Sequence, residues 1–419
     1  MDSAGAVPEF SVDELVLIVS RVTEWPNDQI EVQDHSVEPF SSTVDGFLAE
    51  HYALRVSVRW QGFSPDQSDR KLSFFVKALP RQNPCLVEYL ESIGTFRKEI
   101  TLFEEVLPRI HEAVGGKNFA PRMVFAKANR LIVLENLKTK GYDIVAANNG
   151  LLDGFQLRKA MDALVRLHAG SLIIEKIEGK TLLELYPGVL EENAWVECES
   201  SVRRKDVENV INFWCEIVKL SEKNPKRLAI ILKDLPRVIR KIFEFVKPSS
   251  QFRNVLSHGD LWKNNLMYRS LAGIPEDCVL VDFQMARYVP PAYDLNLVIY
   301  LSTSRIFRKQ HYDALVMDYH THLQKLLATH EIGLDSELFR ESCKLYKSAG
   351  LIHTCLISPE VLLPQSYLQK VMSESDSSCG FMPNSKVTIC LKAFQADPPY
   401  RSRLLDMLDE LIDTEILPQ

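Results

Sequence analysis

The stretch His258-Gly-Asp-Leu-Trp-Lys-Asn-Asn265, followed by Val279-Leu-Val-Asp-Phe283, decides the fold of this 419-residue chain. It contains Asp260, then Asn265 five positions later, and then Asp282 at the end of an apolar run. Transfer of a phosphoryl group from ATP needs one carboxylate to orient the attacking hydroxyl and accept its proton. It also needs an Asn and a second carboxylate to hold the Mg²⁺ that bridges the phosphates. The order of these residues therefore predicts a kinase-type site, with Asp260 catalytic and Asn265 and Asp282 binding the metal.

A β-hairpin would bring the two metal ligands together. Residues 265–268 are typical of a short strand, residues 270–277 contain Gly and Pro and predict a turn, and residues 278–283 are typical of a buried strand. The open end of this hairpin would hold Asn265 beside Asp282, and oxygen ligands converging from two strands suit Mg²⁺. Taken singly, either aspartate of the motif could instead cap a helix or end a strand. The ordered set favours the catalytic interpretation.

The composition argues against several other classes of protein. A hydrophobic content of 46% supports a real core, and the length allows two or more packed units. The formal net charge of −7 argues against a nucleic-acid partner. No apolar run is long enough to span a bilayer, and the acidic N-terminus lacks the features of a secretory signal, so we expect no membrane association. No obligate protein partner is evident.

The cysteines bear on the compartment. Eight cysteines are scattered without a Cys-x-x-Cys pair, so neither a zinc site nor a redox motif is expected. Several lie in apolar runs, as buried free thiols do, which favours a reducing compartment. We therefore expect the protein to be cytoplasmic.

The predicted fold class is α+β, with a small antiparallel N-lobe and a larger helical C-lobe that carries the catalytic hairpin. Residues 1–137 would form the N-lobe, and residues 138–419 the C-lobe with the acceptor site. A capping box at residues 11–14 predicts the start of an N-terminal helix. The other N-lobe elements are expected to be strands at 30–40, 52–60, 72–79 and 131–135 and a helix at 86–106. A cleft between two such lobes is the default ligand site.

Lys77 ends the apolar segment Ser73-Phe-Phe-Val-Lys77, where a lysine needs a partner such as phosphate oxygens. Glu99, on the next helix, would pair with Lys77 and hold it where the α- and β-phosphates of ATP pass. The alternative is an edge-strand lysine with a free tip. The downstream Asp-Asn-Asp set favours the phosphate-binding role.

Four other positions receive roles around the predicted cleft. Glu135 and Leu137, which follow a short apolar strand, would face the adenine through their backbone groups. His258 is interpreted as a structural residue that fixes Asp260 by hydrogen bonds. Asp294 is interpreted as a helix cap that also braces the catalytic loop.

Some polar residues receive weaker assignments. Lys263 could contact the γ-phosphate, although simple surface exposure is the preferred interpretation. His168 is expected to cap or pack in the helical core. The histidines at 311, 320, 322 and 330 lack a His-Glu-x-x-His arrangement and are interpreted as surface residues.

Three absences distinguish the sequence from a protein kinase. Gly259 stands where protein kinases carry an Arg, and Gln284 stands where they carry the Gly that follows Asp-Phe. Only a few residues separate Phe283 from Pro290, and no Ala-Pro-Glu segment occurs, which leaves no room for an activation loop that binds a peptide. The acceptor is therefore expected to be a small hydroxylated molecule held by the helical lobe.

At these residues the chain resembles the ecdysteroid kinase-like family, within the choline kinase and aminoglycoside phosphotransferase group, over about residues 40–330. The matching features are His258-Gly-Asp-Leu-Trp-x-x-Asn265, Val281-Asp-Phe-Gln284, Tyr293-Asp-Leu295, Phe75-Val-Lys77, Phe96-x-x-Glu99, Leu134-Glu-Asn-Leu137 and Leu167-His-Ala169. The resemblance implies a protein-kinase-like fold, the use of ATP and Mg²⁺, and phosphorylation of hydroxyl groups on small acceptors. Ecdysteroids and xenobiotic alcohols are the acceptors that it suggests.

One segment differs from the family pattern. The nucleotide loop reads Asp45-Gly-Phe-Leu-Ala-Glu-His-Tyr52, in which Gly46 and the later Arg55 fit well. Backbone amides of a Gly-rich loop cradle phosphates, and Glu50 beside them would be unfavourable. A catalytically weak or inactive pseudokinase, acting as a small-ligand binding module, is therefore the alternative. An aminoglycoside kinase with an acidic acceptor pocket is a third hypothesis, which the Leu-Trp and Phe-Gln pairs disfavour.

Overall fold

The computed structural model describes residues 7–40, 48–61, 69–80, 83–127, 130–145, 150–373 and 382–418. Gly46, predicted to contact the nucleotide, lies outside the described residues.

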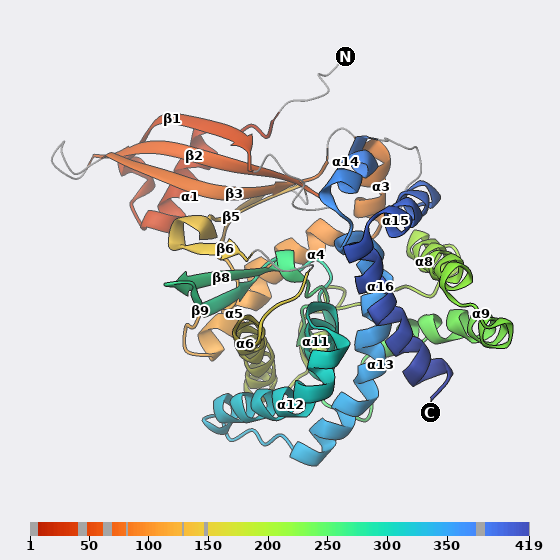
Figure 1. Ribbon diagram of the computed structural model, residues 1–419. Coiled ribbons are helices and arrows are strands. Elements are labelled where there is room, and N and C mark those ends of the chain that lie inside the picture. Colours follow the sequence, from red (N-terminus) through yellow and green to blue (C-terminus); the bar gives the residue numbers. More distant parts are fainter. Residues whose placement is uncertain are drawn as a thin grey trace.

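A five-stranded antiparallel sheet with the order β1-β2-β3-β5-β4 forms the first lobe (Figure 1). Its strands are β1 Ile30–Pro39, β2 Glu50–Trp60, β3 Asp69–Ala78, β4 Met123–Lys127 and β5 Leu131–Glu135. Four of these strands are predicted from the sequence. The fourth strand in chain order, β4, is not, and only one of its five residues is fully buried, against four in β5.

Alternation along β3 separates the core from the cleft, because successive side chains in a strand point to opposite faces. Phe74 and Val76 belong to a small hydrophobic core with Leu15 of helix α1 (Val12–Thr23). Phe75 and Lys77 face the other way and line the pocket between the lobes. Helix α1 begins at the predicted capping box, and its apolar stripe covers the back of the sheet.

The helix predicted over residues 86–106 is broken in two. The structure has α3 (Pro84–Ser92) and α4 (Thr95–Thr101), followed by a π-helical stretch, Leu102–Val106, and by α5 (Leu107–Ala113). The break is at Gly94, which has a left-handed φ of 66° and is the N-cap residue of α4. Only Gly adopts this conformation at little cost, so α4 can leave α3 at a new angle and aim its own buried face at the sheet.

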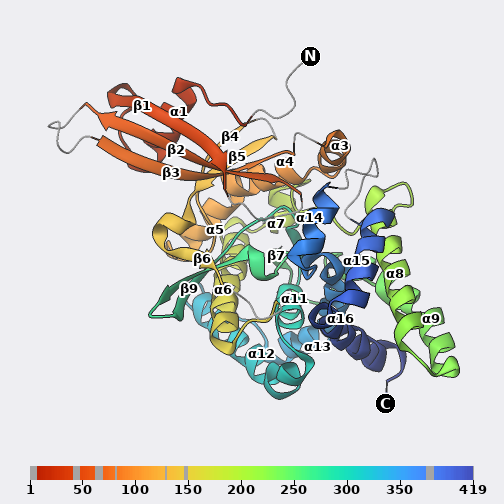
Figure 2. The ribbon, with the colours of Figure 1, turned by 45° about the horizontal axis from the view of Figure 1, so that its top comes forward.

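The predicted catalytic hairpin is present but has a tighter turn than expected. It consists of β8 (Leu266–Leu271) and β9 (Ile274–Leu280), and β8 also pairs with the short strand β6 (Tyr142–Ile144). The turn is only Ala272-Gly273, both at positive φ, as a two-residue hairpin requires. Residues 274–277, assigned to the turn from their Pro and polar side chains, instead extend β9. Both views place the hairpin between the five-stranded sheet and the helical lobe (Figures 1 and 2).

Helices make up most of the second lobe (Figure 2). They are α6 Gly154–Glu178, α7 Leu182–Leu185, α8 Val202–Ser221, α9 Pro225–Arg240, α10 Ile242–Phe245, α11 Ala292–Ser302, α12 Arg305–Ala328, α13 Ser336–Val361, α14 Gln365–Ser373, α15 Asn384–Ala396 and α16 Pro398–Leu411. A second antiparallel pair, β7 (Val255–Ser257) and β10 (Arg287–Val289), flanks the catalytic loop. Helix α11, buried along its whole length, packs against α13 and α6 and forms the floor of the catalytic loop. The architecture therefore confirms the predicted α+β fold.

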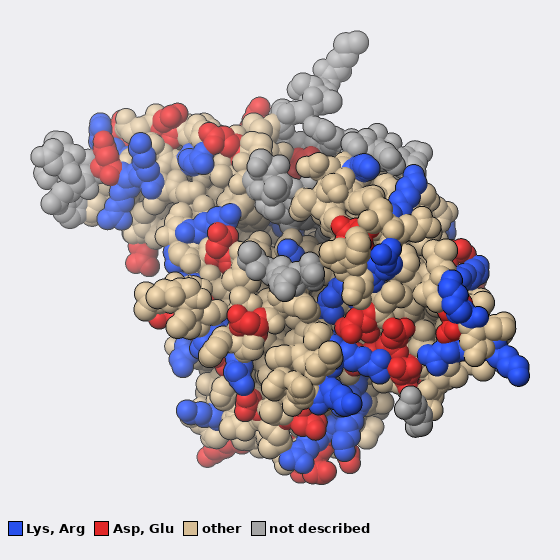
Figure 3. Space-filling model, viewed as in Figure 1, with Lys and Arg blue, Asp and Glu red and all other residues tan. Residues whose placement is uncertain are grey.

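Basic and acidic side chains are interspersed on the face of the molecule that Figure 3 shows. No helix in the described part of the chain is long and apolar enough to cross a membrane. The described free thiols are those of Cys198, Cys215, Cys278, Cys343, Cys355 and Cys390. Cys85 is disulfide-bonded.

Candidate active site

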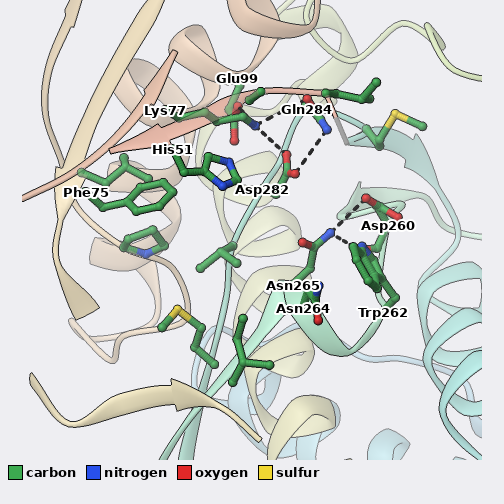
Figure 4. Close-up of a pocket in the computed structure, with 18 of the residues that line it drawn as sticks. His51, Phe75, Lys77, Glu99, Asp260, Trp262, Asn264, Asn265, Asp282 and Gln284 are labelled. Atoms are coloured by element: carbon green, nitrogen blue, oxygen red, sulfur yellow. Dashed lines mark hydrogen bonds and ion pairs between the residues drawn. The ribbon is translucent and has the colours of Figure 1, made fainter. Parts of the chain in front are cut away.

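Lys77 is the centre of a buried ionic network between the lobes (Figure 4). Its Nζ lies 2.6 Å from Glu99 Oε2 and 2.8 Å from Asp282 Oδ1. Strand β3 supplies the lysine, α4 the glutamate, and the segment after β9 the aspartate. The structure therefore brings the predicted Lys–Glu pair together, and the free-tip alternative for Lys77 is wrong.

The neighbouring carboxylates keep Lys77 cationic. Burial alone would lower the pKa of its ammonium group, but Asp282 and Glu99 raise the pKa of Lys77 above its ordinary value. Lys77 is therefore protonated at neutral pH and can neutralise phosphate oxygens.

Asp282 has a strained backbone that directs its carboxylate. Its φ of 69° is left-handed, which costs about 1 kcal/mol or more for a residue with a Cβ. Its Oδ2 accepts a hydrogen bond from Gln284 Nε2 at 3.2 Å, and Gln284 Oε1 lies 3.4 Å from Lys77 Nζ. Both carboxylate oxygens of Asp282 are thus oriented. In the sequence Gln284 stands out only as a replacement for Gly, and no contact is predicted for it.

Asp260 and Asn265 contact each other directly across the catalytic loop (Figure 4). Asn265 Nδ2 donates to Asp260 Oδ2 at 2.9 Å and to Asp260 O at 2.8 Å, which leaves the amide oxygen of Asn265 for another partner. Burial raises the pKa of Asp260 to about 7, and the charge of Asp282 acts in the same direction. A carboxyl group with this pKa is suited to accept a proton near neutral pH.

Asp294 anchors the catalytic loop to α11. It is fully buried, and it accepts the backbone N–H of His258 at 2.5 Å and that of Gly259 at 3.0 Å. Burial would raise the pKa of Asp294, but these bonds and His168, 3.2 Å away, hold it below its ordinary value. The predicted bracing contacts are present. The predicted helix cap is wrong, because the carboxylate is engaged by the loop and α11 has no side-chain cap.

His258 links the two halves of the catalytic motif. Its Nε2 donates to the backbone oxygen of Val281 at 3.0 Å, and its Nδ1 accepts the N–H of Asp260 at 3.3 Å. Burial lowers the pKa of His258, so the ring is neutral and can make one donor and one acceptor contact. These contacts agree with the predicted structural role.

Gly259 is the tightest point of the loop, and substituting it provides a first test. Its φ is 77°, and a Cβ added there would lie 2.3 Å from Met285 O. We expect Gly259→Ala to lower the free energy of unfolding by the cost of the left-handed backbone and by about 2 kcal/mol in addition. The additional loss arises because the loop must move to make room for the new methyl group. The measurement is urea unfolding of both proteins.

The matched control is Gly273→Ala in the hairpin turn. Its φ is 82°, but a Cβ there would meet nothing within 4 Å. It should lose only about 1 kcal/mol, from strain. Equal losses in the two variants would contradict the steric account of Gly259.

A pocket between the lobes contains most of the predicted site. The predicted residues that line it are Lys77, Glu99, Glu135, Leu137, Asp260, Asn265 and Asp282. His258 and Asp294 lie behind it, as structural residues should. Lys263 does not line it, although its neighbours Trp262 and Asn264 do. Residues that the sequence analysis missed include His51, Trp195, Arg203, Gln284, Ile357 and Val361.

The hydrogen bonds of Glu135 limit which of its backbone groups can contact the adenine. The backbone N–H of Glu135 donates to Arg122 O at 2.9 Å, and the Glu135 side chain accepts from Arg122 N at 3.0 Å. Glu135 therefore has no free N–H for a base, and a contact through its backbone oxygen remains a prediction. Leu137 is buried at the pocket wall, and a backbone contact from it remains a prediction.

A lysine on strand β3 that pairs with a glutamate on helix α4, facing Asp260, Asn265 and Asp282 at the open end of the β8–β9 hairpin, is the arrangement of a kinase-like phosphotransferase. The model of the ecdysteroid kinase-like family matches residues 44–332, more than half of the chain. The chain belongs to the ecdysteroid kinase-like family.

The matches among solved structures are distant. A choline/ethanolamine kinase family protein from Mesorhizobium loti is 10% identical, with a TM-score of 0.33, and the match covers 89% of this chain and 92% of that one. A microcompartment-associated aminopropanol kinase is 11% identical, with a TM-score of 0.35 and coverages of 93% and 99%. The GDP complex of an aminoglycoside 2'-phosphotransferase-IIIa is 12% identical, with a TM-score of 0.37 and coverages of 90% and 93%. No curated protein sequence matches significantly. We draw no functional inference from similarities of this size.

Proposed function

We propose that the protein is an ATP-dependent kinase that transfers the γ-phosphoryl group to a hydroxyl of a small, apolar acceptor. The observation that carries the proposal is the convergence of Lys77, Glu99 and Asp282 with Asp260 and Asn265 around one pocket (Figure 4). Lys77 is buried between two carboxylates, one of which belongs to the strained Asp282, and backbone strain of this kind clusters at functional sites.

Each residue has a role in the proposed reaction. Asp260 accepts the proton of the acceptor hydroxyl as its oxygen bonds to the γ-phosphorus, the bond to the β–γ bridging oxygen breaks, and ADP leaves. Lys77, held by Glu99, neutralises the α- and β-phosphates. Mg²⁺, when bound, would neutralise charge that develops on the transferred group.

Asp282 and Asn265 are the residues that fit Mg²⁺. Both line the pocket, and each offers the oxygen donor that Mg²⁺ prefers. The side chain of Asp282 is 28% exposed, so it can be reached from the pocket. Among the described residues no group of three or more His, Cys, Asp or Glu could hold a metal alone. A site of two protein ligands completed by phosphates and water is usual for Mg²⁺ in kinases.

The acceptor is proposed to bind in the part of the pocket that the helical lobe forms. Residues Trp195, Trp262, Met285, Ile357 and Val361 line this part and are predominantly apolar. Such a wall favours a hydrophobic alcohol over a polycationic sugar, which would need an acidic pocket. Ecdysteroids and xenobiotic alcohols are therefore the first acceptors to test.

The contacts of Glu50 bear on the pseudokinase alternative but do not decide it. It rests partly on Glu50, which would repel phosphates from the nucleotide loop. In the structure Tyr52 donates to Glu50 Oε2 at 2.6 Å, and Glu50 is not among the residues that line the pocket.

Calorimetry with ATP, with and without Mg²⁺, tests the proposal. We expect ATP to bind and Mg²⁺ to strengthen the binding, because Asp282 and Lys77 then meet a metal–phosphate complex rather than bare phosphates. A phosphorylated product should then appear by mass spectrometry when steroid and xenobiotic alcohols are added. No binding at millimolar ATP would make the pseudokinase the leading hypothesis.

A further inference from the structure

Lys98, next to Glu99 on α4, has an unusual environment for a lysine. Its side chain is buried, and its Nζ donates to Glu191 O at 2.6 Å, Asn193 Oδ1 at 2.8 Å and Ala286 O at 2.9 Å. The three N–H donors of the ammonium group thus have three acceptors. These acceptors lie on two segments of the helical lobe, one before α8 and one after Asp282.

Asn193 extends the same network. Its Nδ2 donates to Ile93 O at 3.1 Å, just before α4, and to Gln284 O at 3.5 Å, two residues after Asp282. Lys98 and Asn193 together therefore connect both ends of the α3–α4 junction to the chain that carries Asp282. We call this group of contacts the Lys98 anchor.

Glu99 is the residue that the anchor would fix. Its Oε1 accepts the backbone N–H of Phe283 at 3.1 Å, while Oε2 pairs with Lys77. On a helix, neighbouring residues project in different directions, so Lys98 can face the helical lobe while Glu99 faces the sheet. A small rotation or shift of α4 would break both sets of contacts at once.

The position of Lys98 is costly, which argues that it is more than a packing residue. Burial lowers the pKa of Lys98 to about 8. Glu192 and Glu191 oppose this effect, and Arg287 adds to it. An ammonium group taken out of water and aimed at backbone oxygens stabilises one arrangement of segments rather than the fold in general.

We infer that Lys98 and Asn193 are positioning residues that hold α4 in place, so that Glu99 aligns Lys77 and Asp282 for phosphoryl transfer. In protein kinases the helix that carries the paired glutamate is positioned through the phosphorylated activation loop. Here the few residues between Phe283 and Pro290 provide no such loop, and the Lys98 anchor supplies the same restraint permanently. This inference rests on the proposed function.

Lys98→Met tests the inference, because it keeps an unbranched apolar chain of similar length to the lysine stem and removes the ammonium group with its three hydrogen bonds. We expect kcat to fall about 10-fold to 100-fold, as misplacement of catalytic groups does, while the acceptor KM stays within about twofold. The matched control is Arg97→Met, an exposed neighbour on the same helix, which should leave kcat unchanged. An unchanged kcat in Lys98→Met would overturn the inference.

A double variant distinguishes positioning from general destabilisation. If Lys98 acts through Glu99, then adding Lys98→Met to Glu99→Gln should lower kcat no further, because residues that act as a unit are not additive. Independent, multiplying losses would contradict the inference. Asn193→Ala removes the second half of the anchor with a smaller change, and it serves if Lys98→Met does not fold.

Hydrogen exchange gives a readout that does not need activity. In Lys98→Met or Asn193→Ala, the amides of α4 should exchange at least about tenfold faster, while those of α6 should not change. Unchanged exchange in α4 would overturn the inference even if the protein proved to be an active kinase. Faster exchange in α4 of a protein that transfers no phosphate would instead count against the proposed function alone.

Discussion

Asp260→Asn is expected to lower kcat for phosphoryl transfer about 10³-fold while leaving the binding of Mg-ATP unchanged. The substitution removes the group that accepts the proton of the acceptor hydroxyl, and such groups contribute about 10² to 10⁴ in rate. An amide has nearly the same shape as the carboxylate, so the contacts with Asn265 can be kept. The measurement is steady-state kinetics with calorimetry on the same preparation.

The control for this variant is Asp143→Asn, which changes an exposed carboxylate on the nearby strand β6. It should have wild-type kinetics. Full activity in Asp260→Asn would show that another residue, or water, takes the proton. Loss of both activity and nucleotide binding would show that Asp260 is needed for the shape of the pocket rather than for proton transfer.

Asp282→Asn is expected to abolish the Mg²⁺ dependence of ATP binding and to lower kcat at least about 10²-fold. Two changes act together. The metal loses its charged protein ligand, and Lys77 loses one of the two carboxylates that hold its ammonium group at 2.8 Å and 2.6 Å. Calorimetric titration of ATP at several Mg²⁺ concentrations measures the first change.

Glu276→Gln is the matched control for Asp282→Asn, because it removes an exposed charge from β9, the strand that leads to Asp282. It should leave both ATP binding and its Mg²⁺ dependence unaltered. If Asp282→Asn keeps the wild-type Mg²⁺ dependence, Asp282 is not a metal ligand, and its contact with Lys77 is its main role.

Local sequence patterns were sufficient for most of the fold. The apolar segment that ends at Lys77 predicts strand β3, and the capping box predicts where α1 begins. Patterns of this kind act over a few residues, so they can be read without knowing the partners. They failed at Gly94, because a single left-handed glycine within an otherwise helical pattern gives no sign of whether the helix ends there.

The residues of the candidate site also fall into two groups, those that the sequence predicts and those that it does not. Asp260, Asn265 and Asp282 were identified by type and spacing, and Lys77 and Glu99 by their place before them. Gln284 and Lys98 were not, because their importance comes from contacts rather than from pattern. Lys98 donates hydrogen bonds to Glu191 and Ala286, which lie 93 and 188 positions further along the chain. No local sequence pattern encodes contacts over such separations.

The amino-acid sequence by itself determined which chemical groups this protein has, in which order, and on which kind of element. The tertiary structure alone decided which of these groups meet. It placed Asp294 under the catalytic loop instead of at the cap of its own helix, and it raised the pKa of Asp260 towards neutrality by burial. The physical reason is that propensity and periodicity are local, whereas desolvation, charge pairing and backbone strain depend on the segments that packing brings together.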